Sequence, residues 1–227
     1  MRDANCVDRR ESRGGRGRYA RSLCEGRDMD KPVHPTRDEV EFLTLSFNRF
    51  LDLFQEIMTD EFWGKADYVR FSKTRDLFVV YCEILKYPPM QWAIEANKRP
   101  SHSNVGKDLF RFVRHILIHF PFFERWDDVW IKQSLVNLYS SRPQFIHKFL
   151  TEHEGKEQLK YRYWEEKPKR MTYISVSLPN DYTTGKKVFL RDIITEKEGV
   201  KFCAIFMWNI MKIQVEEIKD EGHTVRR

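Results

Sequence analysis

A group of polar residues with the chemistry for anion binding lies near the middle of the chain, between residues 104 and 121. At about 100° per residue of a helix, six polar side chains fall within an arc of roughly 140°: Lys107, Asp108, Arg111, Arg114, His115 and His119. We call these six residues the cationic stripe. Guanidinium groups bind phosphate through paired hydrogen bonds, and an imidazole can accept or donate a proton at neutral pH. The stripe therefore indicates a site for an anion, most naturally a phosphate.

Two other interpretations of the cationic stripe stay open. Most patterns of this kind are the solvated face of an ordinary amphipathic helix. The second interpretation is a metal site, because His115 and His119 are four residues apart, as zinc ligands on a helix often are. Neighbouring arginines would repel a cation, and no catalytic glutamate adjoins these histidines. Solvated faces usually mix glutamate with lysine, so the two histidines beside two arginines favour the anion site.

The run from Arg114 to His119 resembles the Arg-polar-x(3–4)-His signature of the HEPN superfamily, with His115 as the polar residue after the arginine. Members of this family are compact helical bundles. Many of them are metal-independent endoribonucleases of toxin–antitoxin, abortive-infection and CRISPR-linked defence systems. The resemblance implies an active site made from two copies of the motif at a dimer interface. Arg142 and His147 have the same separation, but a proline follows that arginine.

The resemblance implies catalytic roles for Arg114, His115 and His119, and RNA-binding roles for Lys107 and Arg111. Because RNA carries its own nucleophile, the ribose 2′-hydroxyl, no metal and no other cofactor is expected. His119 would move the proton, and Arg114 would neutralise the charge that develops on the phosphoryl group. His115 would orient the phosphate or the catalytic histidine.

These residues predict a metal-independent endoribonuclease, which the resemblance connects with toxins and abortive-infection effectors. RNA, a second copy of this chain and an antitoxin protein are the partners that it implies. The alternative is a non-catalytic helical module that binds RNA or an acidic protein partner through the same stripe.

Composition limits the class of protein. Of the 227 residues, 41% are hydrophobic and 14% aromatic, which suffices for one packed domain. The net charge of +6 permits a nucleic-acid partner without requiring one. The four cysteines are too widely spaced for a zinc ribbon or a disulfide scaffold, and no apolar run is long enough to span a bilayer. We expect a cytoplasmic protein with reduced thiols and no membrane segment.

A bundle of helices must position the stripe. A capping box, with Thr36 at the N-cap and Glu39 three residues later, predicts the start of a helix that continues to about Met58. Further helices are predicted over about 74–86, 104–120, 143–153 and 197–219, with a short piece over 90–98. Trp92, Trp130, Trp164 and Trp208 are expected in the core.

The two ends of the chain differ in character. Residues 1–30 hold eight arginines and almost nothing to bury, so we predict a basic tail that does not fold. This tail is either an RNA-contacting arm or an upstream extension of the reading frame, and its six acidic residues favour the extension. Residues 31–221 are predicted to form one domain.

A small β-structure is expected in the C-terminal third. Alternation over 173–178 predicts a strand that pairs with 187–190, which gives a β-hairpin at about 172–190. Residues 161–164 are a candidate third strand. The predicted fold class is therefore mainly α, a helical bundle with a small β-hairpin appendage.

Overall fold

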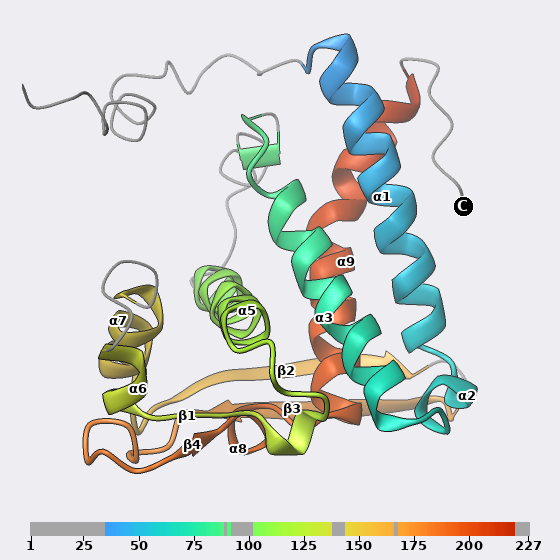
Figure 1. The fold of residues 1–227 in the computed structure, drawn as a ribbon. Coiled ribbons are helices and arrows are strands. Elements are labelled where there is room, and N and C mark those ends of the chain that lie inside the picture. Colours follow the sequence, from blue (N-terminus) through green and yellow to red (C-terminus); the bar gives the residue numbers. More distant parts are fainter. Residues whose placement is uncertain (1–34, 89, 92–101, 138–143, 166–167, 221–227) are drawn as a thin grey trace, which may run out of the picture. The chain divides into compact units, whose positions relative to one another are not determined.

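The structure is a computed structural model that describes residues 35–88, 90–91, 102–137, 144–165 and 168–220. The predicted basic tail lies outside the described residues, and so does nearly all of the predicted piece over 90–98. Helices dominate the described chain, and the strands form two small antiparallel sheets (Figure 1). The predicted fold class is confirmed. Within the described residues, no helix combines the length and the apolar character needed to cross a bilayer.

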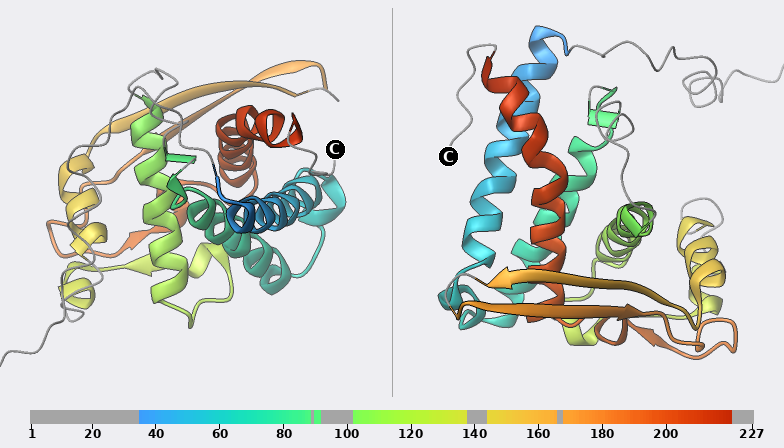
Figure 2. Two further views of the ribbon diagram at one scale, coloured as in Figure 1. Left: turned by 90° about the horizontal axis from the view of Figure 1, so that it is seen from above. Right: turned by 180° about the vertical axis from the view of Figure 1, so that it is seen from behind.

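Three long helices, α1 (Arg37–Ile57), α3 (Asp67–Ile84) and α9 (Lys197–Asp220), pack side by side (Figures 1 and 2). The predicted capping box starts α1: the Thr36 N–H donates to the Glu39 carboxylate at 2.8 Å, and the Glu39 N–H donates to the Thr36 hydroxyl at 3.3 Å. The long C-terminal helix is confirmed as α9. In contrast, α3 begins well before the predicted position. Its N-cap, Ala66, offers no side-chain acceptor, so the sequence carries no capping signal there.

The helix that carries the cationic stripe, α5 (His102–His119), lies between α3 and α7 (Gln144–His153) (Figure 2). It ends where predicted, since Pro121 has no N–H to continue the helical hydrogen bonds. Its buried side is anchored by Phe110, whose ring meets those of Phe78, Tyr81 and Phe206 edge-on at 5.4–6.2 Å. These contacts fix α5 against both α3 and α9.

The predicted pairing of the hairpin is wrong. Strand β3 (Arg170–Ser177) pairs with β2 (Glu157–Glu165), which contains the candidate third strand. Strand β4 (Val188–Phe189) pairs instead with β1 (Trp130–Ile131). The reason lies in the residues between β3 and β4: Tyr182 is fully buried there and its hydroxyl lies 3.2 Å from Nδ1 of His147. This contact holds the segment against α7 and directs the chain to β1.

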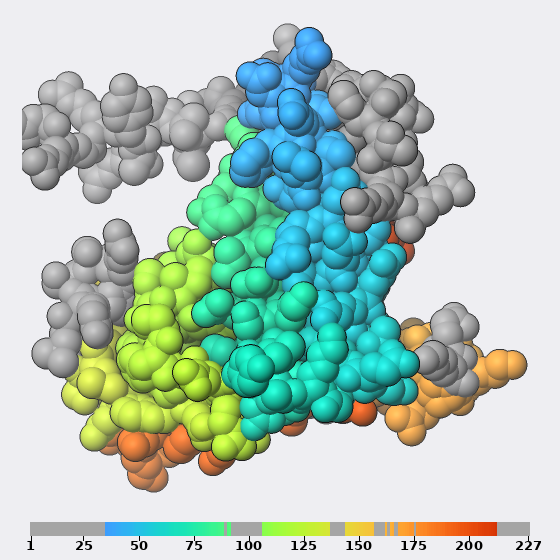
Figure 3. Space-filling model, turned by 45° about the vertical axis from the view of Figure 1, so that its right-hand side comes forward, coloured from blue at the N-terminus to red at the C-terminus, as the bar shows by residue number. Residues whose placement is uncertain are grey.

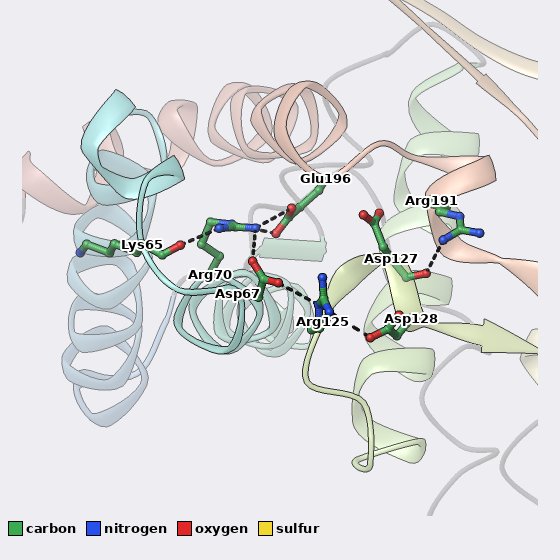
Figure 4. A network of polar contacts seen from close by, with 8 residues as sticks. All are labelled: Lys65, Asp67, Arg70, Arg125, Asp127, Asp128, Arg191 and Glu196. Carbon is green, nitrogen blue, oxygen red and sulfur yellow. Dashed lines mark hydrogen bonds and ion pairs between the residues drawn. The ribbon is translucent and has the colours of Figure 1, made fainter.

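A network of ion pairs fixes α3 to the segment that enters α9 (Figure 4). Arg70 donates to the two carboxylate oxygens of Glu196 at 3.0 and 3.1 Å, and to Asp67 at 2.8 Å. It also donates to the carbonyl oxygen of Lys65 at 2.6 Å. Asp67 is paired in turn with Arg125 at 2.8 Å, which precedes the 3-10 turn η1 (Trp126–Asp128). Three short helices complete the described elements: α2 (Asp60–Trp63), α6 (Gln133–Asn137) and α8 (Leu190–Ile193).

Candidate functional site

The cationic stripe follows the side of α5 that faces away from the core. Lys107 and Arg111 are exposed, whereas Arg114, His115 and His119 are partly buried. The opposite side of the helix is buried and apolar, through Leu109, Phe110, Phe112, Val113, Ile116 and Leu117. The amphipathic character expected of this helix is confirmed. The polar side chains therefore lie along one line between α3 and α7, exposed at Lys107 and Arg111 and partly buried toward the end of the helix.

Arg114 is held by an acid that the sequence did not indicate. Its guanidinium lies 2.7 Å from the carboxylate of Glu83 on α3, and only 19% of the Arg114 side chain is exposed. Lys86 contacts the same carboxylate at 2.5 Å. The Nε atom of Arg114 is buried and has no hydrogen-bond partner among the described residues. One carboxylate therefore serves two cations, and the cluster keeps a surplus of positive charge.

The two histidines of the stripe lie next to each other. The ring centroids of His115 and His119 are 5.3 Å apart, and the His115 ring is 5.4 Å from that of Phe145 on α7. Burial, with a smaller contribution from the nearby charges of Arg114, His119, Arg111 and Lys86, lowers the pKa of His115 to about 4. At neutral pH the His115 imidazole is therefore uncharged. Its buried Nδ1 has no partner among the described residues.

An aromatic side chain of α7 forms the other border of the stripe. The guanidinium carbon of Arg111 lies 4.2 Å from the centre of the Phe145 ring, a cation–π contact. Phe145 is supported by Phe149, whose ring stacks at 4.7 Å on that of Phe112. Neither Phe145 nor Glu83 was found by sequence analysis, because their role follows from the packing of α7 and α3 against α5.

Arg114 and His119 flank His115 rather than facing each other within one helix. Arg114 points toward α3 through its pair with Glu83, while His115 lies toward Phe145 of α7. His119 follows one turn later and is the last residue of α5. Lys107 lies one turn before Arg111, at the other end of the stripe. Together these groups can bind an anionic backbone along the helix and supply imidazoles at one end of it.

Other candidate groups lie outside this site. The described residues contain no cluster of three or more His, Cys, Asp or Glu side chains that could hold a metal. Cys82 and Cys203 are unpaired thiols, and burial raises the pKa of both, that of Cys82 to about 12. Neither cysteine is therefore a nucleophile at neutral pH.

The expectation that the tryptophans belong to the core is partly wrong. Trp130 and Trp208 pack against the core as expected, and Trp92 lies outside the described residues. Trp164 is 49% exposed, because it lies on the face of β2 that is turned away from the helices.

Comparison of this chain with models of protein families, with characterised proteins and with solved structures finds no match. The function must therefore be argued from the residues of the cationic stripe and their surroundings.

Proposed function

We propose that this chain is a metal-independent endoribonuclease of the HEPN type, with its active site on the exposed side of α5. One observation carries the proposal: a guanidinium held in place by Glu83 lies beside two imidazoles whose rings are 5.3 Å apart. An anion-binding group next to groups that transfer protons is what cleavage of a phosphodiester requires. The resemblance of the run from Arg114 to His119 to the HEPN signature adds support.

The chemistry that these groups would perform needs no external nucleophile. The ribose 2′-hydroxyl attacks the adjacent phosphorus as a base takes its proton, and the bond to the 5′-oxygen breaks as that oxygen gains a proton. His119 carries the proton transfer in this scheme, and Arg114 neutralises the charge on the phosphoryl oxygens. His115, uncharged at neutral pH, accepts a hydrogen bond and orients the substrate. The products are a 2′,3′-cyclic phosphate and a 5′-hydroxyl.

A second copy of the chain completes the proposed site. Within one helix Arg114 and His119 lie on either side of His115, so one phosphate is reached more easily by groups from two copies of α5. Arg111 and Lys107 extend the contact with the RNA backbone. A role as a toxin or abortive-infection effector, with an antitoxin protein that covers the site, is part of the proposal and comes from the family resemblance.

A non-catalytic module that binds RNA or an acidic protein is the second candidate. The observation that favours it is the ion pair of Arg114 with Glu83 at 2.7 Å. An arginine whose charge is already balanced by Glu83 is less available to the negative charge of a transition state. The two candidates agree on the binding surface and differ only in whether RNA is cut.

The decisive experiment incubates labelled total RNA with the purified protein in EDTA. Wild type is compared with Arg114→Ala and His119→Ala, after circular dichroism has shown that each variant is folded. We expect the wild type to leave cyclic-phosphate ends and both variants to lose at least 100-fold in rate, the typical contribution of one general acid–base group or one charge-stabilising group. Arg111→Ala should raise KM more than it lowers kcat, because its contribution is to binding.

Matched controls come from the same chain. Arg49→Ala removes an exposed arginine of α1, and His153→Ala removes a histidine of α7, and neither residue belongs to the stripe. Both controls should cut RNA at the wild-type rate. Folded wild-type protein that binds RNA without cutting it would support the non-catalytic module. Equal cleavage by wild type, Arg114→Ala and His119→Ala would show that the motif has no role.

A further inference from the structure

The β2–β3 ribbon has an outward face that carries large side chains. In its antiparallel register Arg162 is opposite Tyr173, and Trp164 is opposite Met171. Directly opposed residues project to the same side of a sheet, as do residues two apart in one strand, so these four side chains share one face. All four are exposed, and Tyr173 and Trp164 are exposed by 72% and 49%.

The other face of the ribbon is the one that packs on the protein. Val176 is buried, and Ile174 packs against the hydrophobic core. Exposure therefore alternates along β3, from exposed Met171 and Tyr173 to partly buried Thr172 and Ile174. This alternation shows that the aromatic residues are exposed because of their position in the pleat, and not because the ribbon is frayed.

The exposed aromatic surface is large for a solvated strand face. Taking about 200 Å² for an aromatic side chain, Trp164 and Tyr173 together expose on the order of 250 Å². With Met171 beside them, the patch reaches the few hundred Å² at which an exposed apolar patch is often functional. A face that needed only to be soluble would carry threonine, lysine and glutamate instead.

Positive charge accompanies the aromatic residues. Arg162 belongs to the same face, and Lys169 and Arg170 are exposed at the tip of the ribbon. Among the described residues of this tip the acid is Glu165, which is engaged by Arg170 at 3.2 Å and by the Thr172 hydroxyl. Figure 3 shows this end of the ribbon, in orange, extending beyond the region of α1 and α2. The end of the ribbon is therefore accessible to a large ligand.

We propose that this outward face, formed by Arg162, Trp164, Met171 and Tyr173, binds single-stranded RNA. Bases stack on Trp164 and Tyr173, while Arg162 and the cations at the tip contact phosphates. Such platforms of aromatic and basic side chains bind single strands with little sequence preference. Diagonal neighbours on a sheet face are about 7–8 Å apart, roughly twice the 3.4 Å of one stacked base step. The two rings can therefore receive bases that are splayed apart.

A second copy of the chain fits this face less well. In a symmetric dimer the same patch faces itself, so Arg162 and the cations at the tip would approach their own counterparts. RNA supplies phosphates of the opposite charge and bases that can stack on the two aromatic rings. The surface is separate from the cationic stripe and goes beyond the proposed ribonuclease, although it would supply that enzyme with substrate.

Binding of a labelled single-stranded oligonucleotide of about 12 residues, with 2′-O-methyl riboses, tests the proposal by fluorescence anisotropy. The methyl group removes the nucleophile, so binding is measured without cleavage. The double variant Trp164→Thr, Tyr173→Thr keeps the β-propensity of the strands and should raise Kd at least tenfold. Tyr68→Ala, which removes a tyrosine of α3 that is 65% exposed, should change Kd less than twofold. Arg162→Ala should lower the slope of log Kd against log salt by about 0.7.

Several outcomes would overturn this proposal. Unchanged affinity of the double variant, or no binding by the wild type, would exclude an RNA-binding role of the ribbon. If sedimentation shows that the double variant loses a dimer that the wild type forms, the face is an interface between copies. Ultraviolet cross-linking of wild type to the same oligonucleotide gives an independent result, because adducts should map to residues 162–173. RNA binding that depends on the ribbon, without cleavage of unmodified RNA, would refute the ribonuclease and leave the ribbon site standing.

Discussion

Replacement of Arg70 by alanine should destabilise the protein more than any substitution of an exposed ion pair. Arg70 binds both oxygens of Glu196, one oxygen of Asp67 and the carbonyl oxygen of Lys65 (Figure 4). The hydrogen bond to Glu196 is the main reason that the pKa of Arg70 is raised. Loss of the guanidinium removes this donor from the Glu196 carboxylate and the Lys65 carbonyl, at the junction of α3 with the entry to α9, whereas Asp67 keeps its pair with Arg125.

The magnitude follows from burial. Only 16% of the Arg70 side chain and 21% of the Glu196 side chain are exposed. Removing one partner of a fully buried pair costs about 3–5 kcal/mol, whereas an exposed pair contributes about 1 kcal/mol or less. For this mostly buried pair we expect Arg70→Ala to lower the free energy of unfolding by about 2–4 kcal/mol. In a chain of this length that corresponds to a fall in Tm of roughly 5–15 °C.

Urea and thermal unfolding, followed by circular dichroism, measure this loss. The control is Arg49→Ala, because Arg49 pairs with Asp76 of the same helix α3 at 3.2 Å, with 49% and 36% of the side chains exposed. That control should change stability by less than about 0.5 kcal/mol. Arg70→Lys should recover only part of the loss, since an ammonium cannot bind a carboxylate in the two-point manner of a guanidinium. A loss below about 1 kcal/mol for Arg70→Ala, or a larger loss for Arg49→Ala, would refute the reasoning from burial.

Three further predictions concern single residues. The pKa of His115 is about 4 in the folded protein and about 6.5 in the unfolded chain. Between these pH values His115 is protonated in the unfolded chain but not in the folded protein, so stability should fall as the pH drops from 6.5 to 4. After allowance for its partial exposure, about 1–2 kcal/mol of that fall should be missing in His115→Gln when urea unfolding is measured at both pH values. Trp126→Phe removes the donor of the buried 2.8 Å hydrogen bond to the carbonyl oxygen of Ile194 and should cost about 2–3 kcal/mol in the same assay; a loss below 1 kcal/mol would show that another donor replaces it. Gly106→Ala should destabilise the protein by about 1–2 kcal/mol, despite the better helix propensity of alanine, because the added Cβ would lie 2.9 Å from the ring of Phe206; a rise in Tm would show that the ring moves aside easily.

The parts of this fold that sequence analysis predicted are those with local signals. A capping box starts α1, and a proline ends α5, so their positions follow from residues a few places apart. The start of α3 has no capping side chain at Ala66 and was missed. Alternation predicted that 173–178 is a strand. The sequence of a strand does not, however, show which other strand its backbone will hydrogen-bond to. The predicted partner of β3, residues 187–190, was therefore wrong.

The candidate site shows the same division between local and tertiary information. Helical spacing was enough to predict that the residues of the cationic stripe share one face, since a single helix fixes their relative directions. Glu83 and Phe145 belong to other helices: Glu83 precedes Arg114 by 31 positions, and Phe145 follows Arg111 by 34. No spacing rule connects them to α5. Their effect on charge and orientation became visible only when α3 and α7 were packed against it.

Those two neighbours give the arginines of the stripe different properties. Arg114 is partly buried and tied to Glu83 at 2.7 Å, so its guanidinium is fixed before a substrate arrives. Fixed donors suit the stabilisation of charge that develops at one point, because they need no reorganisation during the reaction. Arg111 is exposed and rests on the ring of Phe145 at 4.2 Å, a contact that a phosphate can replace at small cost. The proposed enzyme would therefore use Arg111 to hold RNA and Arg114 to accelerate its cleavage, whereas a binding module would depend mainly on the exposed Arg111 and Lys107.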